Sequence, residues 1–398
     1  MYQVKTLSRR DCLLFGLGTV VGIGLHSAKE AMSQSLLMSE LSRSRSVTPE
    51  MAIALESETQ SLKQRAAAKG LFFGAAARHR DLLSSQSLAN SYVRECSVLV
   101  PEWELKWAAG DLPLRPNLDR FDFTRSDGML SFARANGLSL RGHALVWHLS
   151  NPRWLRETLN PSNAEQLLTS HIRTVAAHFA GQIHSWDVVN EAIEVPDGRS
   201  DGLRNSLWLE SLGEAYIDLA FRLTAQVDSR ALRVYNDYGL QYATSSHESK
   251  RKAALKLMER LVASGTPVQA FGIQSHLRAG ETRFDAERLR RFLKDLADLG
   301  LKILITELDV SDQNVPANLS VRDRLVADAY REYLDVVLDE PAVIGVVTWG
   351  LSDRHTWLSG DKPREDGLPV RPLPLDENLE RKPAWWAIAQ AFDNAPLR

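Results

Sequence analysis

Short apolar runs rich in β-branched residues alternate with longer, helix-like segments from about Ser61 onward. One helical segment repeats apolar residues at spacings of three and four and ends before Gly300, a typical residue after a helix C-terminus. The apolar runs predict eight strands: Leu71–Ala75, Val98–Val100, Leu138–Val146, His184–Val189, Arg233–Asn236, Ala270–Gln274, Lys302–Thr306 and Ile344–Thr348.

Eight strands separated by helices predict an α/β protein with a parallel sheet, and eight is the number that closes a (β/α)8 TIM barrel. The structural alternative is an open, doubly wound sheet. That fold would place a glycine-rich phosphate loop after its first strand, and Gly74–Ala77 is not such a loop. We therefore expect the barrel.

The first sixty residues have a different pattern. Lys5, Arg9 and Arg10 precede the apolar run from Cys12 to Leu25, so residues 1–28 predict an export signal that resembles the twin-arginine type. An uncleaved N-terminal anchor is the alternative. Residues 29–60 read as a linker or peripheral helix, and residues 61–398 as the main domain. We expect a bacterial protein exported to the periplasm or beyond, with no stable membrane span after processing.

The composition narrows the function classes. Forty-eight Lys and Arg against 50 Asp and Glu give a net charge of -2, so no electrostatic footprint for nucleic acid is present. Two cysteines cannot form a disulfide framework. Ten tryptophans are many for one chain, and such a surplus hints at a surface that stacks flat ligands, although core packing is the simpler interpretation.

Polar residues gather where the predicted strands end, which is the catalytic face of such a barrel. A polar residue at one strand end is ordinary turn chemistry, but six strands in a row carry them. The segments are Arg141–His148, Trp186–Glu191, Tyr235–Tyr238, Gln274–His276, Thr306–Asp309 and Thr348–Gly350.

Glu191 and Glu307 follow the fourth and seventh strands and suggest paired carboxylates. Glycosidic cleavage needs one carboxylic acid to protonate the leaving oxygen and a second carboxylate to attack carbon or activate water. Asn190 is placed to donate to a sugar hydroxyl, and His276 with Asp309 to keep Glu307 ionised. Either glutamate alone would read as a solvated loop carboxylate.

A zinc site is the competing interpretation of the histidines at these strand ends. His143, His148 and His276 lack the H-E-x-x-H spacing and a cysteine partner. We expect neither a metal nor a cofactor.

From about Ser61 to Phe392 the chain resembles glycoside hydrolase family 10, the (β/α)8 endo-β-1,4-xylanases. The first five of these strand-end segments and the closing Lys382-Pro383-Ala384 occur in the family's order. The resemblance implies that Glu191 is the general acid/base and Glu307 the nucleophile of a retaining double displacement.

The resemblance also implies roles for the neighbouring residues. Asn190 would bind the sugar 2-hydroxyl, and His276 and Asp309 would tune the nucleophile. The implied substrate-binding residues are Glu102, Trp103, Lys106, His143, Trp147, Gln274, Trp349 and Trp357. Of the other tryptophans, Trp107 is expected beside Trp103 at the outer cleft, Trp154 is unassigned, and packing is expected for Trp186, Trp208, Trp385 and Trp386.

The chain departs from the family pattern at three places. Trp103 stands where the family usually has Asn, Leu149-Ser150 replaces Ser-Gln, and Gly239 replaces another Asn. A site that lacks a hydrogen-bond donor discriminates less. We therefore expect catalysis to persist while xylan specificity or affinity is weakened.

Three functions follow as hypotheses: a monomeric retaining endo-β-1,4-xylanase acting on xylan, a retaining β-glycosidase for short xylo-oligosaccharides or mixed β-glucans, and a non-catalytic carbohydrate-binding protein. The last needs no acid/base pair, so the two glutamates argue against it.

Overall fold

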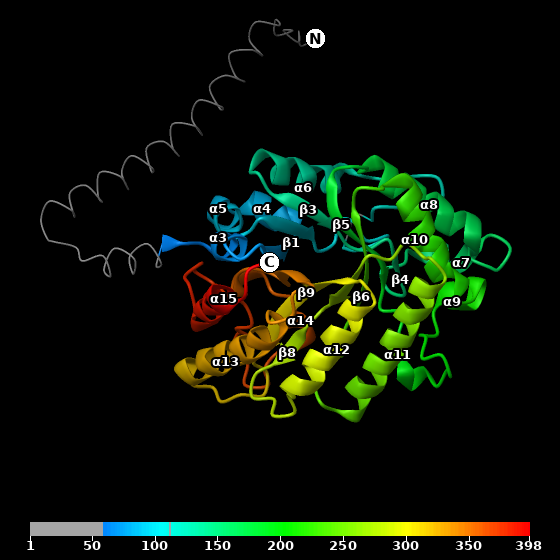
Figure 1. Ribbon diagram of the computed structural model, residues 1–398. Coiled ribbons are helices and arrows are strands. Elements are labelled where there is room, and N and C mark those ends of the chain that lie inside the picture. The colour runs from blue at the N-terminus through cyan, green and yellow to red at the C-terminus, as the bar shows by residue number, and fades with distance from the viewer. Residues whose placement is uncertain (1–58, 111–112) are drawn as a thin grey trace, which may run out of the picture. The chain divides into compact units, whose positions relative to one another are not determined.

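Eight parallel strands close on themselves in the computed structural model, which describes residues 59–110 and 113–398. Strand β10 pairs with both β1 and β9, so the ring is complete and the predicted barrel is confirmed. Figure 1 shows the described chain coloured from blue to red along its length. The eight strands are β1 (Phe72–Ala77), β2 (Val98–Pro101), β3 (Ser139–Gly142), β5 (Ile183–Asn190), β6 (Leu232–Asp237), β7 (Ala270–Ile273), β9 (Lys302–Ser311) and β10 (Val343–Thr348).

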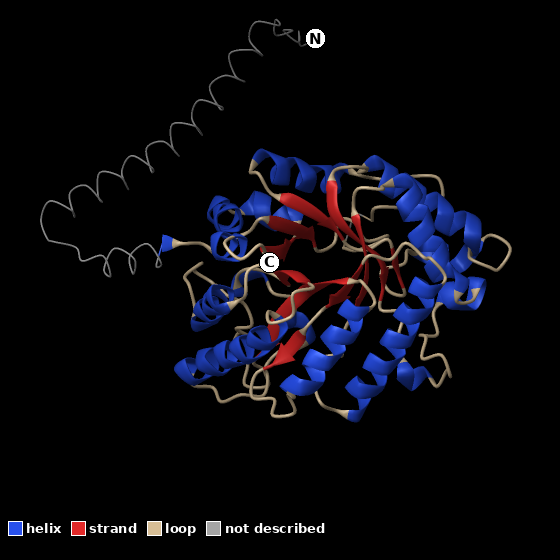
Figure 2. Cartoon of the chain, viewed as in Figure 1, coloured by secondary structure: helices blue, strands red, loops and turns tan. Residues whose placement is uncertain are grey.

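Helices surround this barrel, as Figure 2 shows. The helices that cover it are α3 (Leu62–Ala67), α4 (His79–Ser84), α5 (Gln86–Glu95), α6 (Thr124–Ala135), α7 (Arg153–Thr158), α8 (Ala164–His178), α9 (Leu207–Leu212), α10 (Ala215–Val227), α11 (Ser245–Ala263), α12 (Ala286–Asp298), α13 (Leu319–Val337) and α15 (Pro383–Asn394). Helix α12 shows why they form: its apolar positions fall on one face and are buried, while its other face is charged.

Short elements occupy the carboxyl ends of the strands. Strands β4 (Val146–Trp147) and β8 (His276–Arg278) pair with β5 and β9 there. Turns of helix at η1 (Val195–Asp197), η2 (Asp353–His355) and α14 (Leu358–Asp361) lie in the long loops. These loops, with the strand ends, form the catalytic face in this type of barrel.

Strand β9 runs to Ser311, five residues past its predicted end. Polar side chains alternate with Leu308 and Val310, which are fully buried. Successive strand residues point to opposite faces, so one set packs outward against the helices while the other faces the barrel interior. The polar residues on the inner face of this strand end belong to a polar site. Because such residues are typical of loops, the sequence pattern predicted that the strand ends too early.

The third predicted strand, Leu138–Val146, divides into β3 and β4. At the break, Gly142 lies so close to the Trp186 indole of β5 that a Cβ atom there would be 2.0 Å from the ring. The strand must therefore carry glycine at this point, and the backbone beyond it leaves the regular ladder.

The predicted packing roles of Trp186, Trp208 and Trp385 are confirmed, since each is at most 1% exposed. The same prediction for Trp386 is wrong, because its side chain is 43% exposed. Adjacent residues on a helix lie about 100° apart, so Trp385 and Trp386 of α15 cannot both face the core.

The predicted export signal (1–28) lies outside the described residues, as does the predicted linker (29–60) except for its last two residues. In the part of the chain that is described, none of the helices has both the length and the apolar character that crossing a membrane requires.

Candidate active site

A cavity of about 970 Å³ opens at the carboxyl ends of the strands. Twelve of the thirteen predicted site residues line it: Glu102, Trp103, Lys106, His143, Trp147, Glu191, Gln274, His276, Glu307, Asp309, Trp349 and Trp357. The thirteenth, Asn190, is buried beside Glu191. Residues from both halves of the chain therefore meet at one place.

Glu191 follows the last residue of β5 and has a positive φ of 57°. Its backbone N–H donates to the Asn236 carbonyl oxygen at 2.8 Å, which holds this conformation. A non-glycine residue in the left-handed region costs about 1–3 kcal/mol and is enriched at functional sites. Burial raises the pKa of Glu191, and a hydrogen bond from Gln274 only partly offsets that effect.

Glu307 lies within β9 and is 5% exposed. Asn236 Nδ2 donates to its Oε1 at 2.8 Å, and His276 Nε2 lies 3.4 Å from its Oε2. Burial alone would raise the pKa of Glu307. The hydrogen bond from His276 and the Coulomb interaction with His143 outweigh burial and lower this pKa to about 2.

A chain of contacts keeps His276 positively charged. Its Nδ1 lies 2.9 Å from Asp309 Oδ1, and Trp357 Nε1 donates to the other oxygen of Asp309 at 2.7 Å. Burial would lower the pKa of His276, but the charge of Asp309 and its hydrogen bond raise it to about 10. The imidazolium therefore remains beside Glu307 throughout the neutral range.

Asn236 was missed as a site residue by sequence reasoning. Its amide donates to Asn190 Oδ1 at 2.9 Å and to Glu307, while its own oxygen accepts from Thr306 at 2.6 Å. Gln274 Nε2 contacts the same Asn190 oxygen at 3.4 Å and Glu191 at 2.9 Å. The two glutamates are thus joined through three amides. The available signal was the position of Asn236 at a strand end.

A buried ion pair supports His143. Asp187 accepts from Arg141 at 2.5 Å and contacts His143 Nδ1 at 2.8 Å. All three side chains are at most 2% exposed. Because an unpaired buried charge is costly, Arg141 and Asp187 fix each other and orient the imidazole toward the cavity. Neither had been assigned a role from the sequence.

Lys106 lies among aromatic rings, with its Nζ 4.8 Å from the Trp147 ring and 5.8 Å from the Trp349 ring. Burial lowers the pKa of Lys106, although the charges of Glu102 and Glu307 oppose that effect. The side chain is placed to donate into the cavity between two indoles.

Trp103 lies in the cavity wall with arginines over its ring: the guanidinium carbons of Arg78 and Arg80 are 3.9 and 4.8 Å from the ring centroid. Arg78 also donates to Glu102 at 2.6 Å. The indole is therefore engaged with cations rather than free as a stacking platform for a sugar.

The expectation for Trp107 is wrong. Its side chain is 2% exposed, stacks on His171 with a centroid separation of 3.6 Å and donates to the Leu145 carbonyl oxygen at 2.7 Å. Trp103 and Trp107 are four residues apart, but this segment is a series of turns rather than a helix, so they face different surroundings.

The cavity is also lined by residues without a predicted role, among them Glu194, Tyr238 and His148. Arg204 donates to Glu194 at 2.7 Å and to the Tyr238 hydroxyl at 2.9 Å. His148 Nδ1 lies 3.7 Å from Glu191 Oε2, and burial lowers the pKa of His148 to about 4. This imidazole is too weak a base to be protonated in the neutral range, so it adds no positive charge beside Glu191.

Within residues 59–110 and 113–398, no group of three or more His, Cys, Asp or Glu side chains is arranged to hold a metal ion. What the cavity offers instead is one carboxyl group whose environment favours the protonated form and another held as an anion. Carboxyl pairs with divergent pKa values are the usual arrangement for acid–base and nucleophilic chemistry in one site.

The chain is similar to known proteins over most of the described barrel. The profile of glycosyl hydrolase family 10 matches residues 61–391. A β-1,4-xylanase of Dictyoglomus thermophilum is 33% identical over 327 residues, which are 80% of this chain and 87% of that protein. Endo-1,4-beta-xylanase C of Paenibacillus barcinonensis is 34% identical over 69% of this chain, a match that spans 27% of that protein.

Among solved structures, native xylanase 10B of Thermotoga maritima superposes with a TM-score of 0.75 at 30% identity, covering 84% of this chain and 98% of that one. The resemblance inferred from the strand-end segments is thereby confirmed over almost all of the described barrel. The chain belongs to glycosyl hydrolase family 10.

Proposed function

We propose that the protein is a retaining endo-β-1,4-xylanase. The observation that carries this proposal is the opposite environment of two carboxyl groups in one cavity: burial raises the pKa of Glu191, while contacts with His276 and His143 lower that of Glu307 to about 2. The xylanases among the relatives support xylan as the substrate class.

In the first step, Glu307 attacks the anomeric carbon of the bound sugar. A bond forms between that carbon and a carboxylate oxygen, and the glycosidic carbon–oxygen bond breaks. Glu191 gives its proton to the departing oxygen, so the leaving sugar departs as a neutral alcohol. The bound sugar must lie in the part of the cavity that Lys106 and His143 line, next to Glu307, which Asn236 holds by a hydrogen bond.

In the second step, Glu191 is a carboxylate and acts as general base. It takes a proton from water, the water oxygen bonds to the anomeric carbon, and Glu307 departs as an anion. The imidazolium of His276 stabilises the returning charge on Glu307. Two displacements at one carbon restore the original configuration.

The roles of the two glutamates can be separated by substrate choice. Glu307→Gln is expected to abolish turnover of every substrate. Glu191→Ala should still cleave a dinitrophenyl β-xylobioside, whose leaving group needs no proton, and should accelerate when azide is added. Turnover by a contamination-free Glu307→Gln preparation would overturn the nucleophile assignment.

A second candidate, a β-glycosidase for short xylo-oligosaccharides or mixed β-glucans, is favoured by one observation. Trp103 lines the cavity where the family usually has Asn, and the Arg78 guanidinium lies over its ring. Product analysis on several xylans and a mixed β-glucan separates the two: an endo-xylanase releases a ladder of oligosaccharides from xylan, whereas the alternative leaves polymeric xylan nearly intact.

We also propose that the protein is exported through the twin-arginine route, which is supported by Arg9-Arg10 ahead of an apolar run, and that it is a monomer. The test is to compare periplasmic activity of the full chain with that of an Arg9→Lys/Arg10→Lys variant in a bacterial host. Equal export of both would contradict the route, and size-exclusion chromatography coupled to light scattering would decide the oligomeric state.

A further inference from the structure

The segment between β10 and α15 forms one wall of the cavity with little regular structure of its own. Trp357, Leu358 and Lys362 of this segment line the cavity. Apart from η2 and the four residues of α14, the segment is irregular from the end of β10 to Pro383. A wall of this kind keeps its shape only if side chains tie it to the barrel.

The first tie precedes Trp357. Lys382 Nζ donates to Asp353 Oδ2 at 2.7 Å and to the Arg371 carbonyl oxygen at 2.8 Å, while the Leu373 N–H donates to Asp353 Oδ1 at 2.9 Å. The side chains of Asp353 and Lys382 are 4% and 3% exposed. These hydrogen bonds join the start of the segment, at Asp353, to its end, at Leu373 and Lys382.

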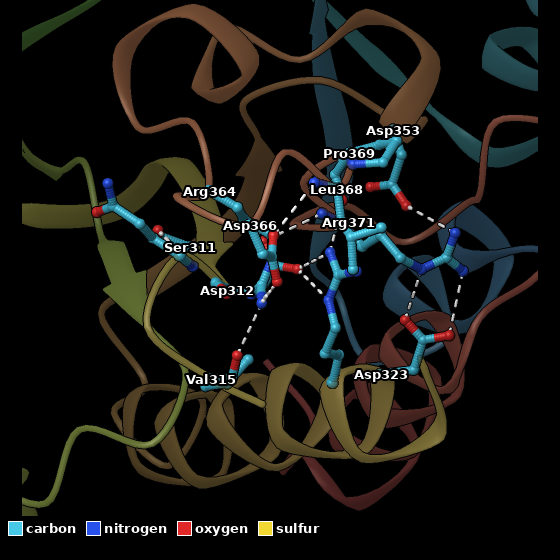
Figure 3. Close-up of polar contacts among 12 residues, drawn as sticks. Ser311, Asp312, Val315, Asp323, Asp353, Arg364, Asp366, Leu368, Pro369 and Arg371 are labelled. Carbon is cyan, nitrogen blue, oxygen red and sulfur yellow. Dashed lines mark hydrogen bonds and ion pairs between the residues drawn. The ribbon is translucent and has the colours of Figure 1, made fainter. Parts of the chain in front are cut away.

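The second tie follows Trp357 and consists of Arg364, which is 7% exposed. Its guanidinium donates to the backbone carbonyl oxygens of Asp312 and, at 2.9 Å, Val315. Its Nε donates to Asp366 Oδ1 at 2.9 Å (Figure 3). A planar guanidinium can engage three acceptors at once in a fixed geometry, which an ammonium cannot.

The backbone to which Arg364 donates, around Asp312, is itself held in place by other hydrogen bonds. Asp312 directly follows β9, is fully buried and accepts from Arg322 Nε of α13 at 2.9 Å. It also accepts from the Arg371 N–H at 3.1 Å. Gln313 Nε2 adds a contact with the Pro363 carbonyl oxygen at 3.0 Å. Arg364 thus connects the wall to a rigid point at the end of β9.

The same strand carries the residue that Trp357 touches. Trp357 Nε1 donates to Asp309 at 2.7 Å, and Asp309 holds the His276 imidazolium beside Glu307. The wall therefore contacts Asp309 within β9 and Asp312 just after it, and the Val310 N–H of β9 also donates to the Pro372 carbonyl oxygen at 3.4 Å. The contact at Asp312 is structural, and the contact at Asp309 belongs to the site.

We propose that Arg364 is a positioning residue, which acts by holding the Trp357 indole in hydrogen-bonding contact with Asp309. Without its guanidinium, the segment after α14 loses its tie to the carbonyl oxygens beyond β9, and Trp357 gains freedom to move off Asp309. The loss would change the surroundings of Glu307, because Asp309 would hold His276 less firmly. It would also change the contacts of the bound sugar, because this wall of the cavity would move.

The direct test is the signal of the Trp357 indole N–H in a nitrogen–proton correlation spectrum, assigned by its absence in Trp357→Phe. We expect Arg364→Met to shift or broaden this signal, and Arg364→Lys to do so less. The matched control is Arg331→Met, which removes an exposed arginine of α13 that pairs with Asp328. An unchanged Trp357 signal in Arg364→Met would overturn the proposal.

The kinetic test is a double-mutant cycle on kcat/KM with an aryl β-xylobioside, and this part rests on the proposed function. We expect Arg364→Met to lower kcat/KM about tenfold, and the Arg364→Met/Trp357→Phe double variant to be no slower than Trp357→Phe alone. Effects that multiply would contradict action through Trp357, because independent residues give additive free energies.

If Arg364→Met does not fold, Arg364→Lys decides both tests, with the same directions and smaller changes. An inactive but folded wild-type protein would refute the proposed function, yet the indole signal would still test the role of Arg364.

Discussion

Replacing His276 with Gln should move the acid limb of the pH–rate profile to higher pH. Gln keeps a hydrogen-bond donor near Glu307 but removes the positive charge. A pKa of about 2 instead of the ordinary 4.5 corresponds to ~3 kcal/mol in favour of the anion. Two unit charges about 4 Å apart interact by ~4 kcal/mol at an effective dielectric constant of about 20, so the charge of His276 is large enough to account for the effect.

The assay is kcat/KM against pH from 3 to 8, which reports the ionisation of groups in the free enzyme. Because Glu307 must be ionised to attack, the wild-type protein should show no acid limb from this group above about pH 3. In His276→Gln the limb should appear near pH 5 or above, since burial is then opposed only by the remaining contacts.

Two variants complete the experiment. Asp309→Asn should shift the limb in the same direction, because His276 loses the carboxylate that keeps it protonated. His178→Gln removes an exposed histidine that pairs with Asp127 and should leave the profile unchanged. Identical acid limbs in wild-type and His276→Gln proteins, with both folded throughout, would refute this account of the nucleophile.

Three further changes have defined outcomes. Because the pKa of His276 is raised to about 10 in the folded state, the folded protein keeps a proton that the unfolded chain loses above about pH 6.5. The free energy of unfolding should therefore fall by up to ~1.4 kcal/mol per pH unit as pH rises from 6.5 to 10, and Tm with it, and His276→Gln should flatten that slope. In the described part of the chain neither ring nitrogen of His171 has a hydrogen-bond partner, and burial lowers its pKa well below 6.5. His171→Phe should keep the stack on Trp107 and raise stability by ~1 kcal/mol, more at pH 5 than at pH 8, as differential scanning calorimetry would show; a lower Tm would contradict this. Trp103→Asn should raise the preference for aryl β-xylobioside over aryl β-xyloside about tenfold, and an unchanged ratio would mean that Trp103 does not limit the second sugar site.

The barrel was predictable because each strand is a short apolar run between helical segments, and strand order in this fold follows chain order. The polar residues at strand ends indicated the location of the site for the same reason. Strand β9 was cut short in the prediction because Glu307 and Asp309 interrupt its apolar pattern. Only the buried neighbours Leu308 and Val310 mark that part as strand.

The partners of the site residues were less accessible from the sequence. Asn236 stood at a recognised strand end, but the two hydrogen bonds that its amide nitrogen donates reach residues 46 and 71 positions away. Trp107 and Trp103 have the same side chain and opposite surroundings, which are set by turns that no periodicity describes. Arg364 lies in an irregular segment, so nothing in its local pattern distinguishes it from a solvent-exposed arginine.

The alternation of inward and outward side chains in β9 limits which mutations the gene can tolerate. Glu307, Asp309 and Ser311 alternate with Leu308, Val310 and Asp312, so inward and outward positions are fixed by parity. Deleting the codon for Thr306 would move every later position of the strand to the opposite face and so displace Glu307, the Asp309 that holds His276, and Asp312 together. Point substitutions can alter these positions one at a time. In a library of variants selected for activity, insertions and deletions in β9 should be absent, whereas surface loops such as 199–202 should accept them.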